Sequence, residues 1–475
     1  MSLIHPDRLF PPDPATRTIT RALFSEICDL PIFSPHGHCD PAWFARDQPF
    51  ADPSSLLIQP DHYVLRMLVS QGVTFEALGL APDGAPRETD PRAIWHLFAR
   101  NYHLFRGTPT RLWMDYTFSE LFGLEVPLTG ATADLYFDRI SDCLGKAEYH
   151  PRALFDRFGI EMLATTEGAL DPLNHHAAIA SSDWSGRVVT TYRPDEVTDP
   201  EHETFAANLE QFAVLSGCDV STWAGYLEAH HVRRAVFRNH GAVATDHGVP
   251  VPQTADLCPQ ECEALFDKVY KGQADVKDAA LFRAQMLTEM ARMSVEDGMT
   301  MQIHPGSLRN HNRRVFTRLG RDKGYDIPRQ VDFVGGLAPL LNAVGDVPGL
   351  KIVVFTLDEA TYSRELAPLA GAYPALFIGP AWWFFDSPDG IRRQHEAVIE
   401  TAGFYNTVGF NDDTRAFPSL PARHDMARRV DCAFLAERVA DHRMTETEAH
   451  DLAFALTLGL PRRTYCIAGA QTCAL

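Results

Sequence analysis

Two histidines in the segment Ser34-Pro35-His36-Gly37-His38 have the spacing of a metal-binding pair. Residues two apart in a strand point the same way, so both imidazoles would project together from its carboxyl end. Two neutral imidazoles in that position can hold one divalent ion. With 20 histidines in 475 residues, chance alone gives roughly one such pair. The spacing alone would therefore not indicate a metal site. The position of the pair at the end of a β-rich run is what favours one.

A carboxylate and a guanidinium with the same spacing, Asp413 and Arg415, follow the last β-rich run of the chain. Asp413 would complete a His-His-Asp set of nitrogen and oxygen ligands that suits zinc or manganese. Arg415 offers a planar fork for a carboxylate or oxyanion of a substrate. The alternative interpretation is a local surface ion pair in a polar loop.

Further polar side chains stand where other β-rich runs end. His304 precedes a Pro-Gly turn and is predicted to be a metal ligand or a substrate donor, the alternative being a turn histidine bonded to backbone. Arg193, Asp246 and Trp382 hold equivalent places. None of them is informative alone, but the carboxyl ends of barrel strands converge at one face. We therefore expect these side chains to share one pocket.

Apolar, β-rich runs alternate with helical patterns along the chain, which favours a closed (β/α)8 TIM-type barrel of the α/β class. An open doubly wound sheet is the competing architecture. The predicted strands are Ile32–His38, Ile160–Thr166, Arg187–Arg193, Ala242–Asp246, Met299–His304, Lys351–Leu357, Ala375–Pro380 and Thr407–Asn411. The helix Asp275–Glu296 begins at an Asp cap and carries Met286, Met290 and Met293 on one stripe, which we interpret as core packed against the barrel.

The first and second predicted strands are separated by roughly 120 residues, far more than an ordinary connection. We predict that residues 39–159 form an inserted helical subdomain over one end of the barrel. Residues 1–38 would supply an N-terminal segment and the first strand, and residues 160–475 the remainder of the barrel. The expected helices are Asp61–Ser70, Pro91–Leu104, Thr110–Leu121, Ala131–Leu144 and Pro151–Phe158. His62 and Tyr63 begin the first of these helices and could reach a pocket beneath the subdomain.

The formal charge of −19 argues against a nucleic-acid partner because no basic stripe offsets it. The chain has no stretch of about 18 apolar residues, and its N-terminus lacks an apolar signal core, so we expect a cytoplasmic protein without a membrane partner. Nine scattered cysteines suit a reducing compartment. Cys258 and Cys262 lack a second pair for zinc, and Cys466 and Cys473 are interpreted as incidental.

Taken together, these residues resemble the uronate isomerase family, also called glucuronate isomerase, an outlying group of the amidohydrolase-type barrels. The resemblance extends over nearly the whole chain in the family's order. Its segments are Asp61–Tyr63 with Arg66, Leu104–Trp113, Met301–Asn310, Trp382–Phe384 with Asp389–Gly390, Asp413–Phe417 and Arg423–Asp425. The chain departs from the family's usual pattern in Ser34–Asp40 and in Thr165–Pro172, which belong to the expected pocket wall.

The resemblance implies that His36, His38 and Asp413 ligate a divalent metal, with zinc expected and manganese as the alternative. The implied substrate contacts are His62, Tyr63, Arg193, Asp246, His304, Trp382 and Arg415. The family interconverts D-glucuronate with D-fructuronate, and D-galacturonate with D-tagaturonate. The implied partner is therefore a small-molecule hexuronate.

Such an aldose–ketose isomerisation moves a proton between C2 and C1 through an enediol, which requires a base and an electrophile. We expect Asp413 to be the base, with Tyr63 and His62 as the competing proton carriers. The alternatives are a mononuclear metal-dependent hydrolase of the amidohydrolase type and a non-catalytic sugar-acid binding protein. A binuclear hydrolase is disfavoured because the fourth and sixth runs end in Asp246-His247 and Leu357-Asp358 and lack the expected lysine and histidine. We also expect a homo-oligomer, as is common for intracellular enzymes of this size.

Overall fold

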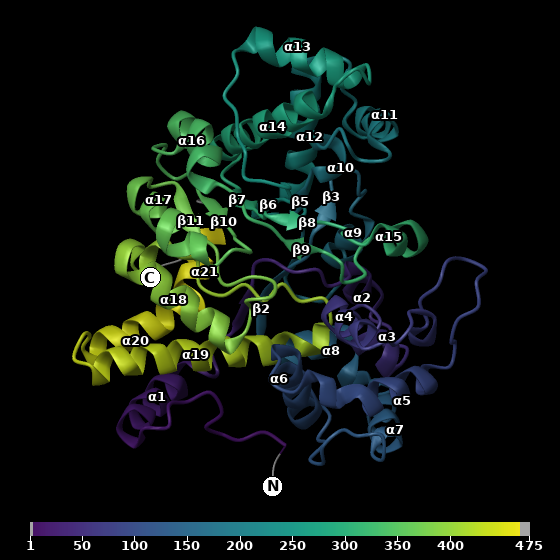
Figure 1. The fold of residues 1–475 in the computed structure, drawn as a ribbon, viewed down its shortest axis with the longest axis vertical. Helices are drawn as coiled ribbons and strands as arrows, with labels where there is room; N and C mark the ends of the chain where they lie inside the picture. Colours follow the sequence, from purple (N-terminus) through teal and green to yellow (C-terminus); the bar gives the residue numbers. More distant parts are fainter. Residues whose placement is uncertain (1–2, 466–475) are drawn as a thin grey trace.

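The computed structural model describes residues 3–465 of the chain. Short parallel strands stand side by side at its centre in the order of the sequence (Figure 1). They are β1 (Ile32–Ser34), β2 (Ile160–Ala164), β3 (Glu167–Gly168), β4 (Val188–Val189), β5 (Tyr192–Arg193), β6 (Ala244–His247), β7 (Thr300–Ile303), β10 (Ile352–Val354) and β11 (Leu376–Ile378). β2 and β3 are two parts of one predicted strand, as are β4 and β5. Backbone hydrogen bonds such as Thr165 N–H to Val189 O (2.8 Å) continue across the breaks.

The last predicted strand, Thr407–Asn411, joins this arrangement by a single parallel bridge between Thr407 and Ile378. Within the described residues it does not form a regular strand, so that detail of the prediction is wrong. Gly409 has a φ of 76°, which turns the chain away from the extended path. Further on, Asp413 N–H donates to His36 O (3.3 Å) and His38 N–H donates to Thr414 O (2.9 Å). These two hydrogen bonds join the eighth segment to the first.

The predicted (β/α)8 fold is confirmed over the competing open sheet, but the strands are shorter than predicted. Proline accounts for three of the early ends, because Pro35 closely follows β1, Pro305 follows β7 and Pro380 follows β11. Proline has no N–H to donate to the next strand. The residues beyond the strand ends therefore form loops at the carboxyl end of the barrel, where the candidate chemistry lies.

Helices alternate with the strands and cover the outside of the barrel (Figure 1). Those between β3 and the eighth segment are α9 (Asn174–Ala180), α10 (Asp195–Thr198), α11 (Phe205–Ser216), α12 (Trp223–Asn239), α13 (Pro259–Tyr270), α14 (Val276–Asp297), α16 (Phe333–Val344), η5 (Tyr362–Leu366), α17 (Ala367–Ala372), α18 (Pro388–Ala402) and η6 (Phe404–Asn406). The outer ends of the chain supply α1 (Pro14–Ile27), η7 (Phe417–Ser419), α19 (Leu420–Ala440), α20 (Glu446–Phe454), η8 (Ala455–Gly459) and α21 (Leu460–Tyr465). Of the helices in residues 3–465, none is long and apolar enough to cross a membrane.

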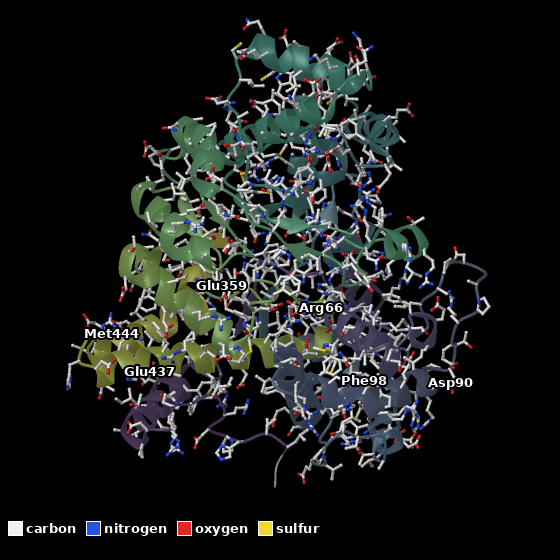
Figure 2. All side chains as sticks on the ribbon, in the orientation of Figure 1. Arg66, Asp90, Phe98, Glu359, Glu437 and Met444 are labelled. Atoms are coloured by element: carbon white, nitrogen blue, oxygen red, sulfur yellow. The ribbon has the colours of Figure 1, made fainter. Side chains whose placement is uncertain are left out.

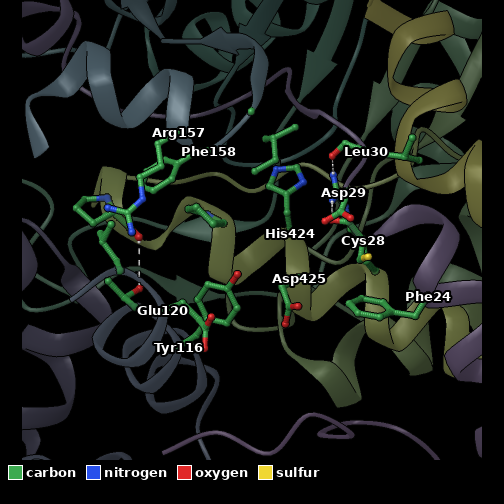
Figure 3. Close-up of a pocket in the computed structure, with 17 residues that line it drawn as sticks. Phe24, Cys28, Asp29, Leu30, Tyr116, Glu120, Arg157, Phe158, His424 and Asp425 are labelled. Atoms are coloured by element: carbon green, nitrogen blue, oxygen red, sulfur yellow. Dashed lines mark hydrogen bonds between the residues drawn. The ribbon is translucent and has the colours of Figure 1, made fainter. Parts of the chain in front are cut away.

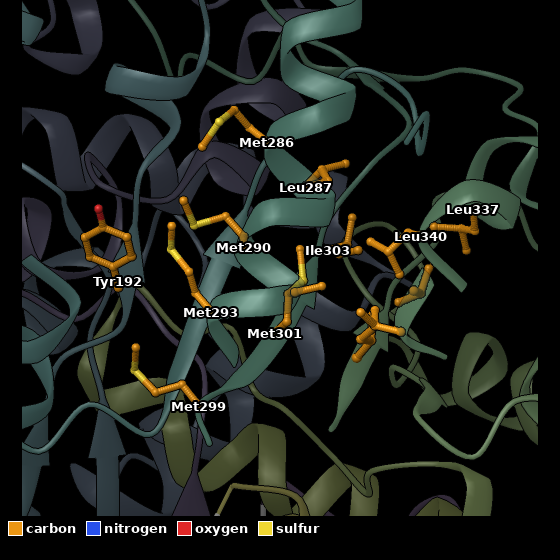
Figure 4. Packing of buried hydrophobic residues seen from close by; sticks show 14 of the residues in the cluster. Tyr192, Met286, Leu287, Met290, Met293, Met299, Met301, Ile303, Leu337 and Leu340 are labelled. Atoms are coloured by element: carbon orange, nitrogen blue, oxygen red, sulfur yellow. The ribbon is translucent and has the colours of Figure 1, made fainter. Parts of the chain in front are cut away.

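The methionine-rich helix predicted from the sequence is α14. Asp275 caps it by accepting hydrogen bonds from the backbone N–H groups of the first turn, and Gly298 ends it with a φ of 76°. The side chains of Met286, Met290 and Met293 are buried against Tyr192 and strand β7 (Figure 4). The interpretation of this stripe as barrel core is confirmed.

The segment between β1 and β2 is helical, as predicted. Its elements are α2 (Pro41–Arg46), α3 (Pro53–Leu57), α4 (His62–Ser70), η1 (Glu76–Leu78), α5 (Pro91–Asn101), η2 (Tyr102–Phe105), α6 (Pro109–Tyr116), η3 (Thr117–Leu121), α7 (Ala133–Leu144), η4 (Ala147–Tyr149) and α8 (Pro151–Arg157). Phe98, labelled in Figure 2, is fully buried among these helices. The same apolar cluster includes Ile32, Ile160 and Phe417 of the barrel. The division of this segment from the barrel as a subdomain therefore stays a proposal.

A hairpin that the sequence analysis did not predict follows β7. It pairs β8 (Ser307–Leu308) with β9 (Ile327–Pro328) in antiparallel fashion and holds α15 (Arg313–Leu319) between them. An ion pair of 3.1 Å between Arg318 and Glu76 connects this segment to the helices that follow β1. The cysteines among the described residues are all unpaired, and Cys466 and Cys473 lie outside those residues.

We predict that Gly409→Ala destabilises the fold strongly. A Cβ at this position would lie 2.5 Å from Leu456 O and 2.7 Å from Pro461 Cδ, in a backbone conformation with positive φ. Backbone strain and steric overlap together should lower the free energy of unfolding by about 2–4 kcal/mol. The matched control is Gly349→Ala, where φ is 86° and nothing lies within 4 Å, so about 1 kcal/mol is expected. Equal losses in urea-unfolding measurements would contradict the steric part of this account.

Candidate active site

The predicted ligand residues His36, His38 and Asp413 come together at the carboxyl end of the barrel. Asp413 Oδ1 lies 3.1 Å from His38 Nε2 and 3.6 Å from His36 Nε2. No described donor makes a well-aligned hydrogen bond to this buried carboxylate oxygen. The three side chains form a group whose ligand atoms all lie within 4.8 Å of one another. Two imidazoles and one carboxylate in this arrangement fit a divalent metal ion.

The backbone places these three ligands. The carbonyl of His36 accepts from Asp413 N–H and the N–H of His38 donates to Thr414 O, which joins the first segment to residues 413–414. Asp413 has a φ of 48°, a left-handed conformation that is uncommon for a non-glycine residue. Trp382 Nε1–H donates to Asp413 Oδ2 (3.1 Å). That bond orients the carboxylate so that its other oxygen faces the histidines.

The protonation states suit metal ligation. Burial is the main reason that the pKa of His36 is lowered to about 4, so its imidazole is neutral near pH 7. Burial alone would raise the pKa of the Asp413 carboxyl, but His38, His36 and Arg415 together lower it well below its usual range. Metal ions bind neutral imidazole and ionised carboxylate. His36 and Asp413 are therefore in the forms that bind a cation.

His304, Asp246 and Arg193 form a second polar layer beside this group. His304 Nδ1 lies 2.5 Å from Asp246 Oδ1, and Arg193 Nη1 lies 3.0 Å from Asp246 Oδ2. The His304 ring stacks on His36, with centroids 4.7 Å apart, and its buried Nε2 has no hydrogen-bond partner in the described structure. Asp246 thus pairs with both neighbours, while one nitrogen of His304 stays available.

His62 and Tyr63 reach this region from the start of α4. The rings of His62 and Trp383 lie with centroids 5.3 Å apart. Burial and then Arg415 lower the pKa of His62 to about 3. Tyr63 O–H donates to Asp386 Oδ1 (2.9 Å), and burial with this neighbouring carboxylate raises the pKa of Tyr63 well above its usual value. Near pH 7 His62 is therefore a neutral imidazole and Tyr63 a phenol.

A cavity of about 560 Å³ opens beside these groups. Its wall includes His38, Arg193 and Arg415 from the predicted set. Arg193 is already paired with Asp246 and, at 2.8 Å, with Asp195. Arg415 Nη2 lies 3.9 Å from Asp322 Oδ1, too far for a hydrogen bond. Of the two arginines among the predicted substrate contacts, Arg415 is therefore the better placed to receive a substrate carboxylate.

Several residues that line this cavity had no role predicted from the sequence. They come from the hairpin segment after β7 and are Arg309, Asn310, Arg321, Asp322, Asp326 and Arg329. Only the resemblance of Met301–Asn310 to the family pointed towards this segment. Nothing in its spacing showed that β8 and β9 pair with α15 between them, since each strand has only two residues.

A second cavity, of about 370 Å³, lies at the opposite end of the strands (Figure 3). Ile32 and Gly159, which stand at the amino ends of β1 and β2, are part of its wall. Among the described residues that line it, none belongs to the predicted site. His424 also lines this cavity, and its Nε2 lies 3.0 Å from Asp412 Oδ2. That contact supports the loop that carries Asp413.

Residues 15–454 match the sequence profile of the glucuronate isomerase family. The chain belongs to this family. The uronate isomerase of Mesorhizobium japonicum is 58% identical over 98% of this chain and 99% of its own length. That of Rhizorhabdus wittichii is 60% identical over 97% and 98%. The crystal structure of glucuronate isomerase from Caulobacter crescentus superposes with a TM-score of 0.96 at 56% identity, covering 98% of this chain and 97% of that one.

The resemblance predicted from the sequence is thus confirmed. Membership of the family supports the isomerase prediction over the hydrolase and the sugar-acid binding protein. The polar groups described above lie at the carboxyl ends of barrel strands, which is where enzymes of this fold place their chemistry.

We predict that buried neutral histidines make the metal-free protein sensitive to mild acid. Burial lowers the pKa of His176 to about 4. Between pH 6.5 and pH 4 the unfolded chain therefore binds more protons at this residue than the folded protein, and stability falls as pH falls. Urea unfolding at a series of pH values measures this decline in the free energy of unfolding. His176→Asn should make the decline smaller, by about 1.4 kcal/mol for each unit of pKa difference between the folded and unfolded states that the substitution removes.

The control for this series is His103→Asn, which replaces an exposed histidine. It should leave the pH dependence of unfolding as it is in the unaltered protein. An unchanged pH dependence in His176→Asn would contradict the assignment of a neutral, desolvated imidazole at this position.

Proposed function

We propose that this protein is an aldose–ketose isomerase that interconverts D-glucuronate and D-fructuronate, and D-galacturonate and D-tagaturonate. Its curated relatives are named uronate isomerases and match it over nearly their full length. The observation that supports the chemistry best is the position of Asp413. Its ionised carboxylate stands beside the imidazoles of His36 and His38, and His38 and Arg415 line the adjoining cavity.

In the proposed reaction a base removes the proton from C2 of the aldose acid and an acid returns a proton at C1. The C1 aldehyde becomes a hydroxymethyl group and the C2 alcohol becomes a ketone, through an enediol. The substrate gains and loses no atoms overall, and no external oxidant or reductant is needed. We assign the base to Asp413, because it is ionised near pH 7 and Trp382 orients it from one side. His62, as a neutral imidazole, is the next candidate for moving a proton.

Tyr63 suits a different part of the same task. Its hydroxyl is bonded to Asp386 and also accepts a hydrogen bond from Phe384 N–H (2.9 Å). Arg423 Nη1 donates to Asp386 Oδ2 (3.1 Å), which fixes that carboxylate in turn. A phenol whose single proton is donated to Asp386 can act as a proton relay between that carboxylate and a substrate oxygen, and a phenolate base is disfavoured by the raised pKa of Tyr63.

The substrate's two ends would be recognised by different groups. We assign the C6 carboxylate to Arg415, whose ion-pair contact among the described residues is the 3.9 Å approach to Asp322. Arg193, Asp246 and His304 would contact hydroxyl groups, with the unpartnered Nε2 of His304 as one hydrogen-bonding atom. The aromatic face of Trp382 borders the same region, since its ring centroid lies 4.6 Å from that of His304.

We propose that His36, His38 and Asp413 hold a divalent metal, zinc in preference to manganese. When bound there, the metal would supply positive charge that stabilises the carbonyl and hydroxyl oxygens of the substrate. A cytoplasmic location and a homo-oligomeric state remain proposals as well. The unpaired cysteines of the described residues support the first, and the size of the enzyme supports the second.

We predict that the purified protein converts D-glucuronate to its ketose in deuterium oxide, followed by proton NMR, with loss of the C2 proton signal. Asp413→Asn should reduce the rate at least about 100-fold, because the amide neither abstracts the proton nor ligates a cation well. The control is Asp346→Asn, an exposed carboxylate far from the barrel mouth, which should behave like the unaltered protein. Unchanged substrate with glucuronate and galacturonate alike would overturn the proposed reaction.

We predict that Arg415→Gln raises KM for D-glucuronate by about 10- to 100-fold, since a charge-assisted hydrogen bond to the carboxylate is lost. Arg321→Gln is the matched control, because Arg321 lines the same cavity but pairs with Glu203 at 2.8 Å. Initial rates over a range of substrate concentrations measure both. If the two variants behave alike, Arg415 is not the carboxylate anchor.

A further inference from the structure

A chain of buried amide and hydroxyl groups connects the C-terminal helix α21 to the ligand His36. Asn411 Nδ2 donates to Tyr465 Oη (3.0 Å), and Tyr465 O–H donates to Gln302 Oε1 (3.1 Å). Gln302 Nε2 then lies 3.5 Å from His36 Nδ1. Gln302, Tyr465 and His36 are each at most 2% exposed. The chain therefore crosses the barrel interior on the far side of His36 from Asp413.

This chain bears on which nitrogen of His36 holds its proton. His36 Nε2 is the atom that faces Asp413 Oδ1. A metal bound at Nε2 leaves the proton on Nδ1, whose neighbour must then accept a hydrogen bond. A carboxamide has a donor end and an acceptor end, so Gln302 can match His36 in either tautomer by turning its amide. The Tyr465 hydroxyl can both donate and accept, so it can hold the amide in both orientations.

We propose that Gln302, backed by Tyr465 of helix α21, is the positioning residue that holds the ring of the metal ligand His36 and, with its amide turned, accepts the Nδ1–H of the metal-bound form. This inference rests on the proposed metal function of His36, His38 and Asp413. Histidines that ligate metals commonly donate their second N–H to a fixed partner, and the strength of ligation depends on that partner. Among the described residues, Gln302 is the hydrogen-bonding neighbour of His36 Nδ1.

Helix α21, which supplies Tyr465, is hydrogen-bonded to residues at the amino ends of β7 and β10. Thr300 Oγ1–H, at the start of β7, donates to Thr464 O (2.6 Å). Lys351 Nζ donates to the same carbonyl (3.1 Å). These two bonds hold the end of α21 near the amino end of β7, and the Tyr465 hydroxyl bonds separately to the Gln302 amide. Helix α21 is therefore connected to the metal site through the hydrogen bond from Tyr465 to Gln302, which neighbours His36.

The test is the zinc affinity of chelator-treated full-length protein, measured by competition with a chromogenic chelator. Gln302→Leu removes the partner of His36 Nδ1 and should weaken zinc binding by about 10- to 100-fold. Gln302→Glu presents an acceptor in every orientation, so it should bind zinc at least as tightly as the unaltered protein. Tyr465→Phe alone should weaken zinc binding. Combined with Gln302→Glu, the same substitution should leave zinc binding as tight as in Gln302→Glu.

The control is Thr300→Val, which removes a docking bond of α21 without touching the chain of hydrogen bonds. Its zinc affinity should match that of the unaltered protein. Equal zinc affinity in Gln302→Leu, Tyr465→Phe and the unaltered protein would overturn the inference while leaving the metal site intact. Loss of affinity in Thr300→Val equal to that in Tyr465→Phe would reduce Tyr465 to a structural role. Absence of zinc binding by the unaltered protein would instead overturn the metal function itself.

Discussion

Two backbone hydrogen bonds, between residues 36–38 and 413–414, place the chemistry of this protein. The segments that they join are separated by more than 370 residues of sequence, and each supplies part of one ligand group. The chain between them has to form a ring of parallel strands before His36, His38 and Asp413 can approach one another. The left-handed backbone at Asp413 and its bond from Trp382 then set the direction of the carboxylate.

Desolvation decides the charge of each group in this region. Burial lowers the pKa of enclosed imidazoles such as those of His36 and His62, so they are already neutral at pH 7. Carboxylates keep their charge where a cationic or hydrogen-bonding neighbour compensates for burial, as Arg193 and His304 do for Asp246. His36 and His62 are therefore neutral imidazoles beside the ionised carboxylates of Asp413 and Asp246, which is the combination that the proposed metal and base functions require.

Much of this arrangement could be predicted from the sequence. The His-x-His pair, Asp413 and the other strand-end residues were recognisable because β-rich runs precede them and barrel strands share one catalytic face. The Met286–Met290–Met293 stripe was recognisable from its helical period. These features depend on residues close together in sequence or on a general property of the fold.

The remainder depends on tertiary contacts that no local pattern encodes. Gln302 and Tyr465 are 163 residues apart, and Tyr63 and Asp386 are 323 apart. The hairpin after β7 consists of two-residue strands that have no periodicity to detect. The eighth segment ends early at Gly409 because Leu456 and Pro461 pack against it, which only the folded chain reveals.

The central claim is that the first and last segments of the barrel build one metal-binding group. Anomalous diffraction at the zinc edge, from crystals of the protein grown with zinc, tests it most directly. We expect a peak about 2.0–2.2 Å from His36 Nε2, His38 Nε2 and an Asp413 oxygen. Zinc bound elsewhere, with these three side chains still in contact only with one another, would contradict it.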